Sequence, residues 1–190
     1  MKKFLLLNLI VLFGALIMHA QTEEAKFSPL DKSPMDMAYF PDNYPVLKIR
    51  DKAADNPVAR VIYSRPQKAG RNIFGELVEY GTVWRVGANE ATEIEFYQNV
   101  KIDNKKIPKG RYTLYAIVQQ DKWTMILNKE TDTWGAFKYD AKKDILRTEV
   151  SVEKTTDTNE SLSMIFEKTQ TGCNLVVAWD TIKVSMPISF

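Results

Sequence analysis

Three stretches between residues 63 and 92 concentrate side chains that can bind or transform a polar ligand. They are Tyr63-Ser64-Arg65-Pro66, Arg71-Asn72-Ile73-Phe74-Gly75 and Trp84-Arg85-Val86-Gly87-Ala88-Asn89-Glu90-Ala91-Thr92. A guanidinium is a planar fork of donors that suits carboxylates, phosphates and sugar hydroxyls. Convergence of Arg65, Arg71 and Arg85 would form an anion or sugar pocket. The alternative is that each arginine pairs with a nearby glutamate and braces a loop.

The segment Gly87-Ala88-Asn89-Glu90 joins two predicted strands. Small residues there let the backbone approach a ligand closely, and Asn89 and Glu90 would then supply amide and carboxylate contacts. The alternative is that Gly87 only serves a turn with positive φ.

Glu93 and Glu95 are two residues apart in a predicted strand, so their side chains share one face of a sheet. That spacing puts the carboxylates roughly 6–7 Å apart, which is near the separation that glycosidases use. Glu90 together with Glu93 or Glu95 would be the pair of such an enzyme. The alternative is a solvent-facing strand, because Ile94 and Phe96 take the opposite face.

Trp134 is the tryptophan most suited to a binding role, because it lies in the loop Thr131-Asp132-Thr133-Trp134-Gly135. In an all-β protein the other three tryptophans are expected in the core. An aromatic side chain in a loop offers a flat face to a sugar ring. It can also simply anchor the loop.

Two scarce residue types exclude several chemistries. The only histidine is His19, in the first 20 residues, and the only cysteine is Cys173. Ser-His and Cys-His nucleophilic pairs, His-ligated metal centres and intrachain disulfides are therefore not expected in the mature chain. Carboxylate chemistry and oxygen-ligated calcium remain open, but no residue cluster points to a metal or cofactor, so we expect none.

The N-terminus has the layout of a secretory signal peptide over residues 1–20. Lys2 and Lys3 precede an apolar run, and Ala20 is a small residue at the expected cleavage point. No cysteine follows that could carry a lipid, so the sequence predicts a periplasmic or secreted protein, with an uncleaved anchor as the alternative. The two lysines account for the excess of 26 Lys and Arg over 24 Asp and Glu. A balanced mature charge argues against nucleic-acid binding and against an anionic membrane surface.

Most of the mature chain has the pattern of short antiparallel strands. Residues 21–45 carry four prolines and predict an extended arm. Residues 46–190 predict one domain of β-branched and aromatic runs separated by short polar turns, which leave no room for crossover helices. The expected fold is an all-β antiparallel sandwich, or jelly roll. The predicted strands cover residues 58–63, 82–86, 92–97, 112–118, 122–128, 146–152, 161–167, 174–179 and 181–189.

Several motifs together resemble the bacterial domain of unknown function 2911 family. Besides the three stretches above, they include Pro108-Lys109-Gly110-Arg111-Tyr112-Thr113-Leu114, Trp123-Thr124-Met125-Ile126-Leu127-Asn128 and Trp134-Gly135-Ala136. The resemblance extends from about residue 33 to the end of the chain. It implies a secreted protein found largely in Bacteroidetes-type bacteria. It implies no activity, because the family is uncharacterised.

Three functions are compatible with these residues. The first is a secreted or periplasmic, non-catalytic protein that binds a small polar or anionic ligand, or a carbohydrate. The second is a structural or envelope interaction module without a small ligand. The third is a carboxylate-based glycoside hydrolase or lyase. The first is preferred, and its predicted ligand-binding residues are Arg65, Arg71, Arg85, Asn89, Glu90 and Trp134.

Overall fold

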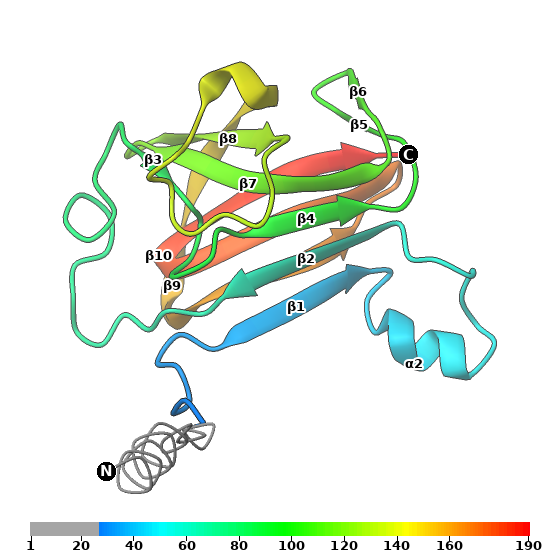
Figure 1. Cartoon of the computed structure of the whole chain (residues 1–190), viewed down its shortest axis with the longest axis horizontal. Helices are drawn as coiled ribbons and strands as arrows, with labels where there is room; N and C mark the ends of the chain where they lie inside the picture. Colours follow the sequence, from blue (N-terminus) through cyan, green and yellow to red (C-terminus); the bar gives the residue numbers. More distant parts are fainter. Residues whose placement is uncertain (1–26) are drawn as a thin grey trace, which may run out of the picture. The chain divides into compact units, whose positions relative to one another are not determined.

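The computed structural model describes residues 27–190, so the predicted signal peptide at 1–20 lies outside the described residues. Asp31–Phe190 form one compact unit (Figure 1). Antiparallel strands dominate this unit, which confirms the predicted all-β class. In chain order the elements are β1 (Met35–Phe40), α2 (Tyr44–Ile49), β2 (Ala59–Ser64), β3 (Val83–Trp84), β4 (Glu93–Phe96), β5 (Val100–Ile102), β6 (Lys105–Ile107), β7 (Gly110–Val118), β8 (Lys122–Asn128), a 3-10 turn (Ala141–Lys143), β9 (Asp144–Lys168) and β10 (Gly172–Ser189).

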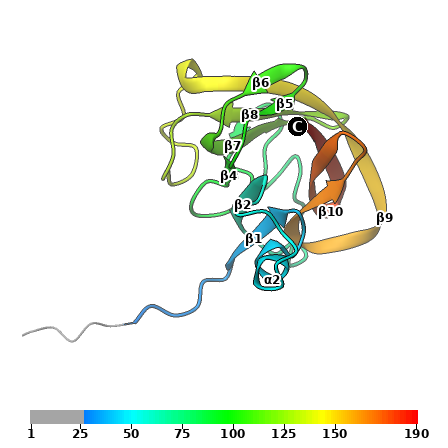
Figure 2. The ribbon, with the colours of Figure 1, turned by 90° about the vertical axis from the view of Figure 1, so that its right-hand side faces the viewer.

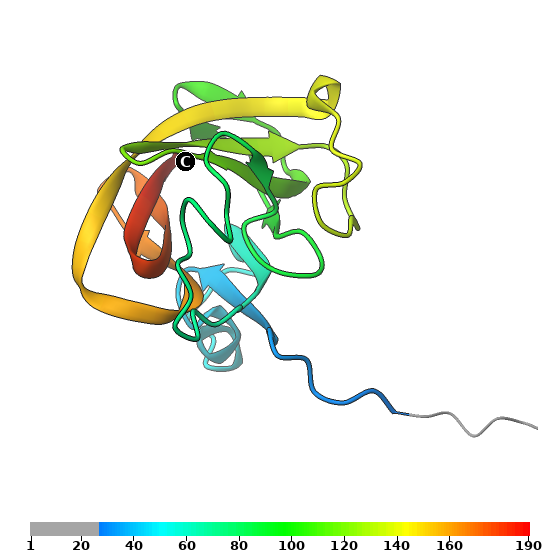
Figure 3. The ribbon, with the colours of Figure 1, turned by 90° about the vertical axis from the view of Figure 1, so that its left-hand side faces the viewer.

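The strands form one hydrogen-bonded sheet in the order β1-β2-β4-β7-β8-β9-β10-β5-β6, with β3 paired to β7. The sheet bends at the long strand β9, whose residues 144–151 pair with β8 and whose residues 152–168 pair with β10. Figures 2 and 3 show β9 sweeping around one side of the curled sheet. The two predicted layers are therefore two halves of a single open sheet that share one core.

Two pairs of predicted strands are continuous in the structure. Residues 146–152 and 161–167 both belong to β9, and residues 174–179 and 181–189 both belong to β10. The polar residues between the predicted strands of each pair have the composition that is expected of turns. They stay extended because they pair with each other, as Asn159 does with Asp180. The pairing shifts register around Asp180, whose φ of 55° marks a bulge.

The inner face of the sheet is apolar, with tryptophans at its centre. Trp84, Trp123 and Trp179 surround Phe74, with ring centroids 5.2–6.3 Å from the Phe74 ring. All three indoles are buried, which confirms the expectation that they belong to the core. Cys173 is also buried there as a free thiol, and burial raises its pKa to about 12.

The segment before residue 46 contributes an edge strand and the start of a helix. Strand β1 pairs along its whole length with β2, from Met35 opposite Ser64 to Phe40 opposite Ala59. Helix α2 was not predicted from the sequence. It tolerates Pro45 because the first turn of a helix needs no backbone donor at that position. Within residues 27–190 no helix is long and apolar enough to span a membrane.

Candidate functional site

The loop 85–92, between β3 and β4, is fixed by side-chain hydrogen bonds to its carbonyls. Ser64 Oγ donates to the Ala88 carbonyl at 2.6 Å, and Thr92 Oγ1 donates to the Val86 carbonyl at 2.7 Å. Both hydroxyl-bearing residues are buried. Buried hydrogen bonds of this kind hold a loop in one conformation. The loop is therefore preorganised.

Gly87 serves close packing within this loop. The positive φ angles belong to Val86 and Asn89 instead, at 53° and 58°. A Cβ on Gly87 would lie 3.4 Å from Thr92 Oγ1 and 3.6 Å from the Ser64 carbonyl oxygen. The glycine thus lets the loop lie against β2, so the proposed turn with positive φ at Gly87 is wrong.

A second loop, 129–139, pairs with the first through its backbone. Ala91 N donates to the Thr133 carbonyl, and Gly135 N donates to the Asn89 carbonyl, each at 2.9 Å. Glu90 and Trp134 consequently face each other as an isolated antiparallel bridge. Three of the predicted site residues, Asn89, Glu90 and Trp134, are therefore brought together.

The second loop encloses a hollow of about 500 Å³ on the outer face of the sheet. Trp134 is 61% exposed and Phe137 is 84% exposed, and both line it. Tyr115, on β7, forms the buried part of the lining, and its hydroxyl is 3.1 Å from Thr133 Oγ1. Lys138 also lines the hollow. Aromatic faces and hydrogen-bonding groups thus surround one space.

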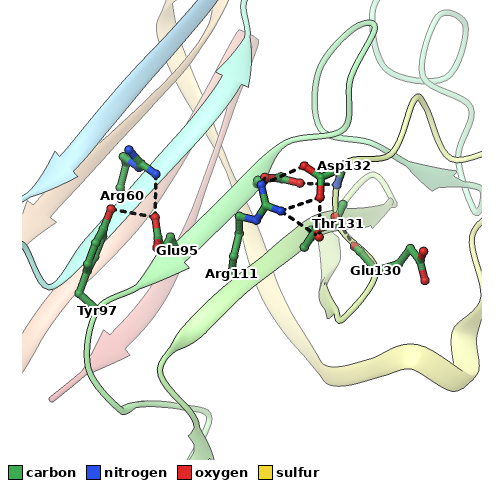
Figure 4. A network of polar contacts seen from close by, with 9 residues as sticks. Arg60, Glu95, Tyr97, Arg111, Glu130, Thr131 and Asp132 are labelled. Carbon is green, nitrogen blue, oxygen red and sulfur yellow. Dashed lines mark hydrogen bonds and ion pairs between the residues drawn. The ribbon is translucent and has the colours of Figure 1, made fainter.

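Acidic groups near the hollow are paired with basic side chains. Arg111 donates to both carboxylate oxygens of Asp132, at 2.6 and 3.0 Å (Figure 4). Arg111 also lies 3.2 Å from the Glu93 carboxylate. Hydrogen bonds from Thr131 and from Arg111 lower the pKa of the Asp132 carboxyl, and the Asp132 bond raises the pKa of Arg111. Glu93 also accepts a hydrogen bond from Asp132 N at 2.6 Å. This network holds the beginning of the second loop against β4.

Two further carboxylates, those of Glu130 and Glu95, are also paired with basic side chains. Glu130 forms an ion pair with Lys143 on the edge of the hollow. Glu95 binds Arg60 at 2.7 Å and accepts a hydrogen bond from the Tyr97 hydroxyl at 2.8 Å (Figure 4). Burial, followed by the bond to Glu95, raises the pKa of Tyr97 to about 12.

Glu93 and Glu95 share the outer face of β4, as their spacing predicted, while Ile94 and Phe96 are buried. They have different arginine partners, however, because Glu93 contacts Arg111 and Glu95 contacts Arg60. Within residues 27–190 no group of His, Cys, Asp or Glu is arranged to hold a metal ion.

The three arginines of the predicted site do not form a shared cluster. Arg65 donates to Asp36 at 2.9 Å and to Ser163 Oγ at 2.9 Å, so it ties β1 and β2 to β9. Arg71 donates to the backbone carbonyls of Lys68 and Gln67 in its own loop. Neither makes a described contact with loop 85–92. Both side chains therefore stabilise local structure, which was the alternative to ligand binding. Their acceptors are not the glutamates that were expected.

Arg85 differs from both. It directly follows β3, where Val83 pairs with Ile117 and Trp84 pairs with Ala116. Because Trp84 faces the core, alternation places Arg85 on the outer face. Its Nε is buried without a hydrogen-bond partner, and burial lowers the pKa of its guanidinium.

Sequence reasoning did not select Tyr115, Phe137 or Lys138. Phe137 and Lys138 follow Trp134 closely, and two aromatic residues in one loop are a signal that could have identified them. Tyr115 gives no such signal, because it lies in the middle of an ordinary apolar strand. Only the folding of loop 129–139 over β7 makes it part of the site.

Fold and site together define an antiparallel β-sheet protein with an aromatic and charged hollow on its outer face. The family model described as a protein of unknown function, DUF2911, matches residues 47–188. The chain therefore belongs to the DUF2911 family, which confirms the resemblance carried by its motifs. No curated protein and no solved structure matches the chain.

Proposed function

We propose that this protein is a non-catalytic carbohydrate-binding protein and that the hollow formed by loop 129–139 is its binding site. The observation that carries the proposal is the position of Trp134. It is the one tryptophan of the four that is exposed, while the other three are at most 8% exposed in the core. A large aromatic side chain exposed beside a hollow is where ligands commonly bind.

The chemistry of the hollow favours a sugar. The faces of Trp134 and Phe137 suit the C–H surface of a pyranose ring, which is apolar and flat. Ion-paired side chains at the rim, such as Glu130 with Lys143, offer acceptors and donors for hydroxyl groups without leaving a bare charge. Apolar faces edged by a few polar groups are typical of small-molecule sites.

The fixed conformation of the second loop supports ligand binding in the hollow. The second loop is held by the Arg111 network on one side and by the backbone pairing with loop 85–92 on the other. A site that is already ordered loses little conformational entropy when its ligand binds.

A binding role is favoured over glycoside hydrolysis by the state of the glutamates. Glu93 and Glu95 are each engaged by a separate arginine, so they do not form an isolated carboxylate pair of the kind that a glycosidase places on either side of the scissile bond. Glu90, the third acid of that alternative, is exposed beside Trp134. An exposed carboxylate of this kind can accept a hydrogen bond from a sugar hydroxyl.

The first 20 residues support export, so we also propose that the mature protein begins after Ala20 and acts in the periplasm or outside the cell. Soluble carbohydrate fragments are ligands that an exported binding protein would meet there.

A thermal-shift and calorimetric screen tests the proposal. The chain from residue 21 to 190 is titrated with neutral and acidic mono- and oligosaccharides, and a sugar that binds only the native state must raise Tm. Trp134→Ala and Phe137→Ala should abolish the shift. Phe190→Ala, which removes a half-exposed aromatic outside the hollow, is the matched control and should leave the shift unchanged.

The proposal is contradicted if no sugar in the panel changes Tm or produces heat. It is also contradicted if a sugar binds to the Trp134→Ala protein with the same affinity as to the wild-type protein.

A further inference from the structure

A second region of the surface, at the C-terminal end of β10, combines exposed aromatic surface with positive charge. Phe190 is half exposed there and lines two hollows, of about 580 and 550 Å³. The linings of the two hollows share Thr171 and Phe190, so the hollows adjoin each other, and together we call them the end groove. No residue of the end groove lines the hollow of loop 129–139. The end groove is therefore a separate candidate site.

The backbone around Phe190 is held on two sides. Phe190 N donates to the Thr171 carbonyl in the turn between β9 and β10, at 3.2 Å. The preceding residue, Ser189, pairs with Lys101 of β5. Figure 1 shows this end of β10 beside the β5–β6 hairpin. The exposed aromatic ring is thus attached to an ordered backbone, which limits the entropy that a ligand would have to remove.

The larger hollow has an aromatic wall. Phe40, Phe166 and Phe190 line it, with ring centroids 5.5 Å apart for Phe40 and Phe190 and 6.4 Å apart for Phe40 and Phe166. Its charged side chains are Asp42 and Lys168, one of each sign. Hollows of this size with aromatic walls and few polar groups are typical of small-molecule sites. The three rings favour an apolar portion of a ligand.

The smaller hollow carries positive charge. Lys101 and Lys106 both line it, and they lie directly opposite each other in the antiparallel β5–β6 pair. Like charges in directly opposite positions destabilise a strand pair. Neither lysine forms an ion pair with any residue from 27 to 190, and no acidic side chain of that range lines this hollow. An anion bound between the two ammonium groups would offset their repulsion.

We propose that the end groove binds an anionic amphiphile, a single molecule with an alkyl chain and a carboxylate or phosphate head group. The alkyl chain lies against the rings of Phe40, Phe166 and Phe190, and the head group lies between Lys101 and Lys106. This second activity is independent of the proposed carbohydrate binding.

The layout of the end groove selects an amphiphile over a purely apolar or a purely ionic ligand. Its aromatic part and its cationic part meet at Thr171 and Phe190, so one elongated molecule can contact both. Lysine ammonium groups are point charges that accept any oxyanion. The alkyl chain therefore supplies most of the affinity, and the head group supplies the preference for an anion.

Calorimetric titration of residues 21–190 tests the proposal with hexanoate, decanoate and tetradecanoate below their micelle-forming concentrations. Alkyl phosphates and alcohols of the same chain lengths are titrated in parallel. We expect each added methylene group to tighten binding about two- to fourfold until the chain fills the groove. An anionic amphiphile should bind at least about fivefold more tightly than the alcohol of equal length. The carboxylate and phosphate arms identify the preferred head group.

Variants assign the two parts of the ligand to the two parts of the groove. Lys101→Gln combined with Lys106→Gln should remove the preference over the alcohol and keep the dependence on chain length. Phe190→Ala should weaken the binding of anions and alcohols alike. The matched controls are Lys105→Gln, on the same hairpin, and Phe137→Ala, because neither residue lines the end groove. Both controls should bind as the wild type does, and thermal unfolding confirms that each variant is folded.

Absence of saturable binding by every chain length overturns the proposal. Equal affinity for anions and alcohols overturns the anionic head group. An anion preference that survives the double lysine substitution overturns the assignment of Lys101 and Lys106, and their charges would then only protect the sheet edge from pairing with another chain.

Vesicles of phosphatidylcholine with phosphatidylglycerol provide the last comparison. Binding to these vesicles without binding of the monomeric amphiphiles would assign the end groove to a membrane surface and overturn the single-molecule ligand. The sugar titrations use a different hollow, so failure of either proposal leaves the other standing.

Discussion

Both faces of the sheet carry tryptophan and phenylalanine side chains, which are buried on the inner face and exposed on the outer face. On the inner face Trp84, Trp123 and Trp179 pack around Phe74 and lose almost all contact with solvent. On the outer face Trp134 and its neighbour Phe137 stand exposed beside a hollow. The difference comes from the backbone. Strand alternation and the folded-over sheet cover the inner group, while a loop held by polar contacts presents the outer group.

Removing one tryptophan from each face gives the largest contrast. Trp123→Ala should lower the free energy of unfolding by about 3–5 kcal/mol, because a fully buried indole leaves a cavity. Trp134→Ala should change it by no more than about 0.5 kcal/mol, since the side chain is mostly in water already. Urea unfolding measures both values. Equal losses for the two variants would mean that Trp134 is a structural anchor of its loop.

The pH dependence of stability at alkaline pH should report on the inner face through Cys173, whose thiol is buried there. Burial raises its pKa from 9.0 to about 12, so the folded state keeps a proton that the unfolded state loses. The resulting stability is complete below pH 9 and is lost as the pH rises towards 12, on the order of 4 kcal/mol in total. Tyr97 and Tyr139, whose pKa is raised to about 12, act in the same direction above pH 10.

Urea unfolding of wild type and Cys173→Ala between pH 8 and pH 11 measures this contribution. The variant should show a shallower decline with pH, whatever its stability at pH 8. A decline of identical slope in both proteins would show that the thiol titrates in the folded state as it does in the unfolded one.

Replacing Arg85 should have a small effect on stability, and in the opposite direction to the loss expected for Trp123→Ala. Arg85→Met keeps much of the length of the side chain and removes the unpartnered charge. We expect the free energy of unfolding to stay unchanged or to rise by about 1 kcal/mol, because an unsatisfied buried group is destabilising. Loss of more than about 1 kcal/mol in urea unfolding would instead assign Arg85 a structural role.

The sequence allowed the all-β class to be predicted because its periodicity is local. Ile182, Val184, Met186 and Ile188 occupy alternate positions of the chain, and they lie in β10 as that alternation indicates. The bend of the sheet at β9 was not predictable, since it depends on which strands pair with each half of one long strand. Helix α2 was missed because the prolines around it obscured its first turn.

The site was only partly predictable for a similar reason. Trp134, Asn89 and Glu90 were selected by residue type, and their proximity arises from pairing between two loops that are distant in the sequence. Arg65 and Arg71 were selected on the same grounds, yet they satisfy carboxylates and carbonyls elsewhere. Residue type identifies groups that can bind, and only tertiary contacts show which of them remain available.

Tryptophan fluorescence quenching by acrylamide tests the carbohydrate site most directly. Trp134 is the only exposed indole among the four, so it should account for nearly all of the accessible emission, and Trp134→Phe should remove that component. Addition of the oligosaccharide that binds best should protect this emission from acrylamide in the wild-type protein. Unchanged quenching at a saturating sugar concentration would show that the sugar does not cover Trp134 and would contradict the site.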